Sequence, residues 1–264
     1  EFTDDRWLMF ATRQGTVKKT VLSAYGNVRS TGINAINIDE GDALIDVQLC
    51  DANSDIVLAT QDGMSIRFHQ GDVREMGRAT AGVKGIELDA EDAVIGMVIV
   101  RREATLLVVS EKGYGKRSEL TEYRVQKRGG KGIITLKKTE KTGRMVALKE
   151  VIPDDELMMI TRHGVVIRVP VEGISVIGRN TQGVRVMNLD DGTAIDYSGD
   201  LRYTAYRGHE DWGYQPPSPQ WSPSSTFVAY RDWAIDRSFV VDIRTGTRTD
   251  VGSGTPQWAR NDDV

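Results

Sequence analysis

The segment Leu106-Leu107-Val108-Val109-Ser110-Glu111-Lys112-Gly113 carries the pattern that sets the architecture of this 264-residue chain, because it is one of four copies. In each copy an apolar run leads through a polar turn into a glycine. The runs are residues 8–12, 56–60, 106–110 and 157–161, and the glycines are Gly15, Gly63, Gly113 and Gly164, spaced 48, 50 and 51 residues apart. Glycine supplies the positive φ that tight hairpin turns need, so the pattern predicts four β-hairpins.

The rest of each unit repeats as well. After the glycine come a short strand, a polar loop with an arginine and a glycine, an alternating strand, a turn and a last apolar strand. We expect short strands at 16–21, 64–68, 114–117 and 165–169, alternating strands at 33–38, 83–88, 133–136 and 184–189, and last strands at 43–49, 93–100 and 145–152. Four strands in a unit of about 50 residues are typical of a propeller-like blade, and helical periodicity is nearly absent. The sequence therefore predicts an all-β fold of about four blades in residues 1–196.

Basic residues recur at two positions of the repeat. The fourth residue after the turn glycine is Lys19, Arg67, Arg117 or Arg168, and the polar loops carry Arg29, Arg78, Arg128 and Arg179. Because radial repetition places equivalent residues on one ring, we expect a curved track of cations, which suits the backbone of bent duplex DNA. The alternative is that these side chains keep exposed strand edges soluble.

Composition bounds the function further. The net charge is -4, but residues 112–149 hold twelve Lys or Arg against three Glu, a local balance of +9 that favours phosphate binding. No apolar run approaches the ~18 residues of a membrane span, and the N-terminus does not resemble a signal peptide. The single cysteine, Cys50, excludes an internal disulfide framework and indicates a cytoplasmic protein.

The third polar loop reads Gln126-Lys127-Arg128-Gly129-Gly130-Lys131-Gly132. Its cations suit phosphate contacts, and its glycines allow backbone N–H groups to approach an anion. This heptapeptide resembles the GyrA-box of the DNA gyrase A chain. The loops that begin Met76-Gly77-Arg78 and Ile177-Gly178-Arg179 resemble degenerate copies of it, and residues 1 to about 196 are similar to the C-terminal domain of that gyrase chain.

The resemblance implies a β-pinwheel with strands exchanged between blades, which binds and wraps duplex DNA without sequence specificity. It implies an accessory role in negative supercoiling, no cofactor and no active site. The implied partners are the rest of the gyrase A chain and the gyrase B chain. The DNA-binding residues would be residues 126–132 with Lys19, Arg67, Arg117, Arg168, Arg78 and Arg179. The chain opens at what resembles the second blade of the family, so whether the late box is primary or secondary stays open.

Residues 197–264 depart from this pattern. Pro219-Gln220-Trp221-Ser222-Pro223 and Pro256-Gln257-Trp258 lie 37 residues apart and resemble a TolB-type propeller repeat, although Ser224-Ser225 replaces the usual Asp-Gly. We expect one further blade here, with strands at 227–230 and 239–243, which docks on the open end of the ring. An engineered or recombined chimera, acting as a protein-interaction scaffold without DNA wrapping, is the alternative.

Enzyme motifs are not found. His69, His163 and His209 stand in no metal-binding frame, and no G-x-S-x-G elbow occurs. Cys50 ends an apolar strand and is predicted to be a small buried hydrophobe. The sequence thus predicts neither a catalytic nor a metal site.

Overall fold

A computed structural model describes residues 2–27, 32–100, 103–161 and 166–189, and in the tail the backbone of four strands. The strands are β1 Trp7–Thr12, β2 Thr16–Val21, β3 Leu44–Cys50, β4 Asp55–Thr60, β5 Met64–His69, β6 Val83–Lys84, β7 Val94–Val100, β8 Thr105–Ser110, β9 Tyr114–Glu119, β10 Ile133–Ile134, β11 Met145–Val151, β12 Glu156–Ile160, β13 Val166–Pro170, β14 Val184–Arg185, β15 Gln220–Trp221, β16 Phe227–Asp232, β17 Arg237–Asp242 and β18 Arg248–Gly252. Four 3-10 turns complete the described elements: Leu22–Tyr25, Gln70–Asp72, Leu120–Glu122 and Val171–Gly173. Within these ranges no helix has the length and apolar character to cross a membrane.

The predicted hairpins form the centre of each blade. β1 pairs with β2, β4 with β5, β8 with β9 and β12 with β13, all antiparallel. The turn glycines Gly15, Gly63 and Gly113 have φ of 84°, 84° and 77°, as hairpin turns of this kind require. The fourth predicted turn glycine, Gly164, lies outside the described residues.

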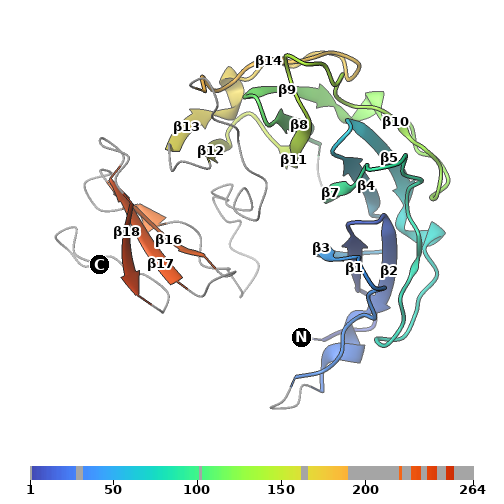
Figure 1. Cartoon of the computed structure of the whole chain (residues 1–264). Helices are drawn as coiled ribbons and strands as arrows, with labels where there is room; N and C mark the ends of the chain where they lie inside the picture. Colours follow the sequence, from blue (N-terminus) through green and yellow to red (C-terminus); the bar gives the residue numbers. More distant parts are fainter. Residues whose placement is uncertain are drawn as a thin grey trace. The chain divides into compact units, whose positions relative to one another are not determined.

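In blades 1 to 3 each four-stranded sheet takes its outer strand from the following repeat (Figure 1). The strand orders are β3-β1-β2-β6 in blade 1, β7-β4-β5-β10 in blade 2 and β11-β8-β9-β14 in blade 3. The alternating segments therefore pair with the hairpin of the preceding repeat, which is the strand exchange that the resemblance implies. The segment 33–38, by contrast, forms no strand.

The exchanged strands are shorter than the sequence predicts, with two residues each. Each exchanged strand pairs with the first residues of its partner strand, directly after the hairpin turn. Strand pairing therefore cannot continue beyond that turn. In blade 2 the N–H groups of Thr135 and Leu136 donate instead to the carbonyl oxygen of Gly63, at 2.8 and 3.2 Å. The turn glycine thus ends the outer strand as well as the hairpin.

Apolar side chains fill the spaces between neighbouring sheets. One core cluster joins blades 1 and 2 and includes Met9, Leu58 and Met97, and a second joins blades 2 and 3 and includes Val57, Val108 and Leu148. Cys50 is 3% exposed and belongs to the first cluster, which confirms its predicted burial. These cores hold the three sheets as consecutive layers and leave the exchanged strands on their outer edges.

The chain divides into two compact units. The first comprises Glu1–Ser110, Tyr114–Val151 and Ser175–Val186, and the second comprises Glu111–Gly113, Ile152–Ile174 and Met187–Val264. In the second unit the tail forms an antiparallel sheet of order β15-β16-β17-β18, and β16 and β17 lie at the two expected strands. The TolB-type identity and the domain boundary at residue 196 stay predictions, and Pro256-Gln257-Trp258 lies outside the described residues.

Candidate nucleic-acid interface

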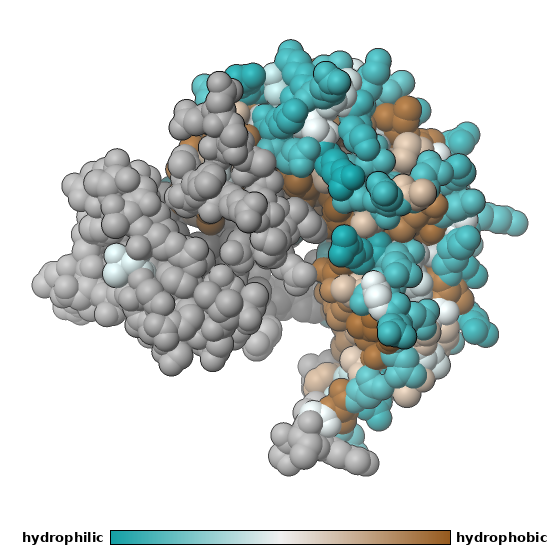
Figure 2. All heavy atoms as spheres, in the orientation of Figure 1, coloured by the Kyte–Doolittle hydropathy of each residue, from teal (hydrophilic) through white to brown (hydrophobic). Residues whose placement is uncertain are grey.

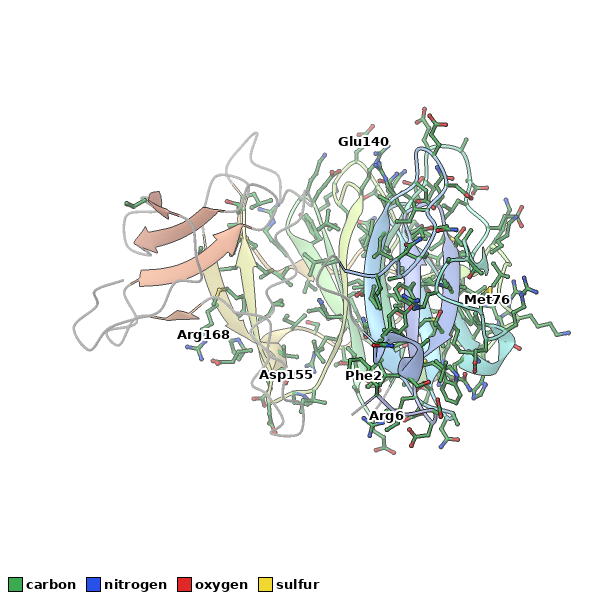
Figure 3. All side chains as sticks on the ribbon, turned by 90° about the horizontal axis from the view of Figure 1, so that it is seen from below. Phe2, Arg6, Met76, Glu140, Asp155 and Arg168 are labelled. Carbon is green, nitrogen blue, oxygen red and sulfur yellow. The ribbon has the colours of Figure 1, made fainter. Side chains whose placement is uncertain are left out.

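Three outer loops run along the edge that the exchanged strands form: residues 73–82, 123–132 and 174–183, here the first, second and third outer loops. Figure 3 shows Met76, in the first outer loop, at the outer margin of the sheets, whereas Glu140 lies at one end of them. Hydrophilic residues cover most of the outer margin and are interrupted by hydrophobic patches (Figure 2). The second outer loop contains the box, residues 126–132.

The loop arginines connect successive loops. Arg128 donates from Nε to the carbonyl of Asp72 at 2.8 Å and from Nη1 to that of Lys84 at 2.9 Å. Arg179 donates from Nη1 to the carbonyl of Ile134 at 2.8 Å, and Arg78 makes the equivalent but longer contact of 3.5 Å with Asn34. The carbonyls of Asn34, Lys84 and Ile134 lie 50 residues apart, at one position of the repeat. The predicted DNA-binding arginines thus use some of their N–H groups to fix the spacing of the loops. Their other N–H groups remain for further contacts.

The glycines of the box have different structural roles. Gly129 has φ of 82°, and its N–H donates to the carbonyl of Gly85 at 2.6 Å, so this N–H is already engaged. Gly132 has φ of 78°, and a Cβ there would lie 2.1 Å from the carbonyl oxygen of Ser65. A Cβ on Gly130, in contrast, would meet nothing closer than 3.9 Å. The positive φ therefore explains Gly129, positive φ and packing explain Gly132, and neither explains Gly130.

The two lysines of the box are both on the surface. Lys127 is exposed, and among the described residues its ammonium has no hydrogen-bond or ion-pair partner. Lys131 pairs with Asp89 at 2.8 Å, with side chains that are 63% and 71% exposed. The hydrogen bond to Asp89 raises the pKa of Lys131, which keeps it charged. Such an exposed pair is weak, so a phosphate can compete for Lys131.

The cations after the turn glycines are not the exposed ring that the sequence predicts. Lys19 is 7% exposed, and its ammonium donates to the side chain of Gln70 at 2.8 Å. Arg67 donates to Asp55 and to the carbonyls of Leu120 and Tyr123 at 2.9 and 3.3 Å.

Arg117 is 6% exposed, and its backbone pairs with Ser175 and Ile177 at 2.9 Å each. Because the 3-10 turn or outer loop of the next repeat covers these positions, Lys19, Arg67 and Arg117 tie neighbouring repeats together. Only Arg168 remains on the surface, 47% exposed in its side chain and paired with Glu156.

Two further lysines lie buried beneath the outer loops. Lys18 and Lys116 are both 0% exposed. The ammonium of Lys18 donates to the carbonyls of Ala35, at 2.6 Å, and Arg78. That of Lys116 donates to the carbonyls of Gly178, at 2.7 Å, and Arg179, and to the hydroxyl of Thr181. Burial, assisted by the nearby Arg78 or Arg179, lowers the pKa of each lysine to about 8.

The box has no such lysine beneath it. The equivalent residue is Ile66, whose side chain lies under Gly130. The box also lacks the threonine that, in the first and third outer loops, donates to a loop carbonyl, as Thr80 does to Gly77 and Thr181 to Gly178. Its cations instead stand on the outside, at Lys127 and Lys131.

The structure adds exposed cations that the repeat analysis missed. Arg74 and Arg124 occupy one position of the first and second outer loops, and Lys84, in β6, is the second residue after the first loop. Arg74 and Arg124 are 50 residues apart, which is the length of one repeat, so their recurrence could have been found in the sequence. The predicted loop cation Arg29 and the histidines His163 and His209 lie outside the described residues. No group of metal-ligating side chains occurs in the part of the chain that the structure describes.

Fold and surface together define a class of protein: a β-pinwheel whose strand-exchanged blades present cationic, glycine-containing loops on their outer edge. The sequence pattern of the family described as "DNA gyrase C-terminal domain, beta-propeller" matches residues 6–51, 54–101, 104–151 and 155–194, one match for each repeat. The chain belongs to this family.

Curated relatives and solved structures agree with this assignment. The chain is 45% identical over 190 residues to the DNA gyrase A chain of Haloquadratum walsbyi, covering 71% of the chain and 22% of that protein. It is 45% identical over 199 residues to the corresponding gyrase chain of Deinococcus deserti, covering 74% and 24%. The chain thus spans about a quarter of the length of these relatives.

Two solved structures are similar at 26% identity over 74% of this chain. One is the C-terminal domain of DNA topoisomerase IV, with a TM-score of 0.70 and 62% of that chain covered. The other is the DNA gyrase A C-terminal domain, with a TM-score of 0.67 and 66% covered.

Proposed function

We propose that the chain binds duplex DNA without sequence preference along its outer loops and bends it, the accessory role of a gyrase A C-terminal domain in negative supercoiling. The observation that carries this proposal is Lys127, an exposed cation, unpaired among the described residues, on a loop whose backbone is fixed on both sides. Gln126 donates to the carbonyl of Arg67 at 2.7 Å, and Gly129 to that of Gly85 at 2.6 Å. A loop whose backbone is already fixed loses less entropy when its side chain meets a phosphate.

The proposed contacts differ from the predicted set. Lys127, Lys131, Arg74, Arg124 and Lys84 would meet phosphates directly, with the remaining donors of the loop arginines beside them. The Nε2 amide of Gln126 is buried without an acceptor among the described residues, so a DNA contact of Gln126 stays a prediction. We assign Lys19, Arg67 and Arg117 to the fold, and a DNA contact of Arg168 stays a prediction.

The wider setting follows from the family. As partners we propose the remainder of a gyrase A chain together with a gyrase B chain. The compartment would be the cytoplasm, and this chain would contain no catalytic residue. The domain would hold a bent DNA segment for the enzyme, while the catalytic residues belong to other parts of the assembly.

A charge-matched comparison tests the proposal. We expect Lys127→Ala to weaken binding of a duplex of about 40 base pairs and to lower the salt slope by about 0.9, the effect of one lost phosphate contact. Asp89→Asn frees Lys131 and should tighten binding. Arg13→Ala removes an exposed cation from the turn between β1 and β2, away from the outer loops, and is the control. Equal affinities and equal plasmid linking numbers for Lys127→Ala and Arg13→Ala would refute the proposal.

One observation favours the scaffold alternative. Val125 and Val176, at one position of the second and third outer loops, are 55% and 43% exposed. Apolar side chains on a protruding loop suit a protein partner better than a phosphate backbone. An absence of DNA binding at ~50 mM salt, where phosphate contacts are strong, would select this alternative.

A further inference from the structure

The turns that enter the last strand of each blade change their charge from blade to blade. The turn of blade 1, residues 37–43, has a net charge of -3, and that of blade 2, residues 87–93, has -4. The corresponding turn of blade 3, residues 137–144, has +3 and is one residue longer. We call residues 137–144 the basic turn. The inversion of sign occurs in the turn that directly follows the box and β10.

In each acidic turn one carboxylate stabilises the backbone of the turn. Asp42 accepts hydrogen bonds from the N–H groups of Gln14 and Ala43 at 2.8 and 2.7 Å, and Asp92 makes the same pair with Asp62 and Ala93. In the basic turn Gly143, with φ of 69°, takes this place. The inserted residue lengthens the turn, and Gly143 donates to the carbonyl of Thr139 at 2.9 Å.

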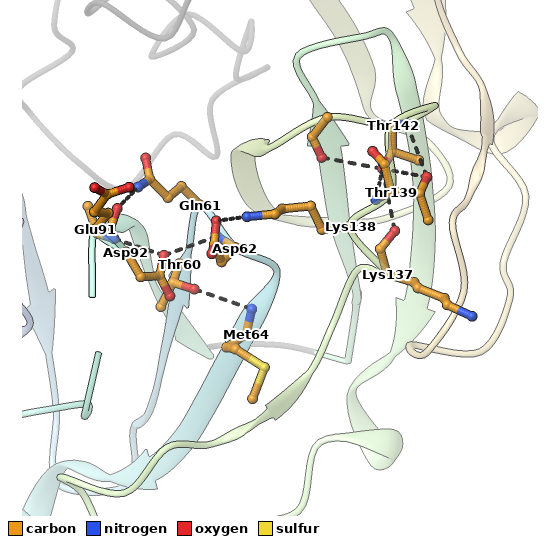
Figure 4. A network of polar contacts seen from close by, with 12 residues as sticks. Thr60, Gln61, Asp62, Met64, Glu91, Asp92, Lys137, Lys138, Thr139 and Thr142 are labelled. Atoms are coloured by element: carbon orange, nitrogen blue, oxygen red, sulfur yellow. Dashed lines mark hydrogen bonds and ion pairs between the residues drawn. The ribbon is translucent and has the colours of Figure 1, made fainter. Parts of the chain in front are cut away.

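Threonines, not lysines, stabilise the basic turn (Figure 4). Thr142 is 0% exposed, and its hydroxyl accepts from the N–H of Thr139 at 3.0 Å and lies 3.4 Å from the carbonyl of Lys137. Lys138 pairs with Asp62, and Lys137 points away from this network. Lys137 and Lys141 are both exposed. Their charges are therefore not needed to form the turn.

A second element brings another cation to the basic turn. The ammonium of Lys141 lies 5.2 Å from the ring centroid of Tyr114, and the guanidinium of Arg185, from β14, lies 5.4 Å from the same ring. Arg185 also donates to the hydroxyl of Tyr114 at 3.0 Å, which lowers the pKa of Tyr114. Tyr114 is 6% exposed, so it forms a floor on which two exposed cations converge.

We propose that Lys137, Lys141 and Arg185 form a second phosphate-binding site for the DNA backbone at the end of blade 3. This site rests on the proposed function and extends it: DNA held at the box continues over the basic turn. Lys131 and Lys137 are six residues apart, at most ~20 Å of extended chain. That distance spans about six base pairs, so one duplex can reach both sites.

Salt-dependent binding to a duplex of about 40 base pairs tests the site. The variant is Lys137→Gln with Lys141→Gln, which keeps Lys138, both threonines and Arg185 in place. We expect a several-fold loss of affinity and a salt slope lower by about 2, because two phosphate contacts are lost. The control is Arg13→Gln, at the equivalent end of blade 1, where we expect neither change. Thermal unfolding should be the same for all three proteins.

The outcomes separate this site from the proposed function. A lower salt slope of binding in the double variant, but not in Arg13→Gln, supports the site. If the double variant binds with the parent's affinity and slope while Lys127→Ala is weakened, the second site is wrong and the box stands. If both bind like the parent, the proposed function itself fails. Glu91→Gln, in the acidic turn of blade 2, should leave the slope unchanged, and a steeper slope would place the DNA over blade 2 instead.

Discussion

Buried cations are the least expected feature of the residue scale. Lys18, Lys19, Lys116 and Arg117 are at most 7% exposed in a domain whose surface is proposed to bind DNA. Burying an ammonium is costly unless its donors are satisfied, and here carbonyl oxygens of the next repeat accept hydrogen bonds from Lys18, Lys19 and Lys116. These cations therefore connect repeats, and the cations proposed for DNA are those whose charged groups stay exposed or keep donors that the fold does not use.

Arg67 and Arg168 occupy the same position of the repeat but should respond oppositely to mutation. Arg67 and its partner Asp55 have side chains that are 19% and 16% exposed, and Arg67 also holds two carbonyls of the next repeat. We expect Arg67→Ala to lower the free energy of unfolding by about 2–4 kcal/mol. Arg168→Ala should change it by less than about 0.5 kcal/mol, because its ion pair is exposed. Urea unfolding measures both, and equal effects would contradict the assignment.

The buried lysines predict a stability that depends on pH. The pKa of Lys18 and Lys116 is about 8 in the folded chain, against an ordinary value of 10.5. Between these values the unfolded chain binds more protons, so the free energy of unfolding rises as pH increases from about 8 toward 10. Burial raises the pKa of Tyr25 and Tyr123, which opposes this trend only above pH 10.

Unfolding of the parent and of Lys18→Met with Lys116→Met, measured between pH 7.5 and 9.5, checks this expectation. The parent should gain stability across the range, and the variant should show a flatter profile. A parent that loses stability relative to the variant as pH rises would show that the fold favours the ammonium form, and parallel profiles would show that burial does not shift these lysines.

At the scale of elements, the sequence predicts best what lies within one repeat. The hairpins β1–β2, β4–β5 and β8–β9 follow from apolar runs and turn glycines, and they lie within a residue or two of the expected bounds. The expected strand 133–136 is only two residues long, because Thr135 and Leu136 bond to the turn of another repeat. Alternation along the chain predicts that Lys19 and Arg67 are exposed. The structure shows them largely covered, because the loop that covers each belongs to the next repeat. Local periodicity carries no information about such a cover.

Glycine substitutions in the outer loops should separate folding from binding. Gly132→Ala would place a Cβ 2.1 Å from the carbonyl of Ser65 in a backbone with φ of 78°, so it should displace β10 and cost several kcal/mol. Gly77→Ala, in the first outer loop, meets no atom within 4 Å and should leave thermal unfolding nearly unchanged. Gly130→Ala should keep the fold but weaken DNA binding, if close approach of a phosphate is the reason for this glycine. A stable Gly132→Ala protein would contradict the packing.

For the whole molecule, the distribution of charge matters more than its sum. The chain has a net charge of -4, yet the exposed cations gather on the outer loops and the basic turn while acidic turns occupy the same end in blades 1 and 2. Like charges on the acidic turns repel a phosphate backbone, so under the proposed function the arrangement would confine DNA as well as attract it.

This distribution predicts how affinity depends on salt and on DNA sequence. Binding should weaken steeply with salt, with a slope of several units, because phosphate contacts release counterions. Two duplexes of one length and different base composition should bind within about threefold, since the proposed contacts are to phosphates, which carry no sequence information. Titration by fluorescence anisotropy measures both, and a strong preference for one sequence would point to base readout.

The strand exchange has a consequence for how such a domain changes its length in evolution. Within the described part of the first unit, blade 1 needs β6, and β6 lies beyond both β4 and β5 of blade 2. A recombination breakpoint between two repeats therefore leaves a blade without its fourth strand, and one placed after β6 divides blade 2 instead. No single breakpoint between β3 and β11 yields only whole blades. A fusion at any of these points starts with an unpaired strand edge, which the newly joined segment has to cover.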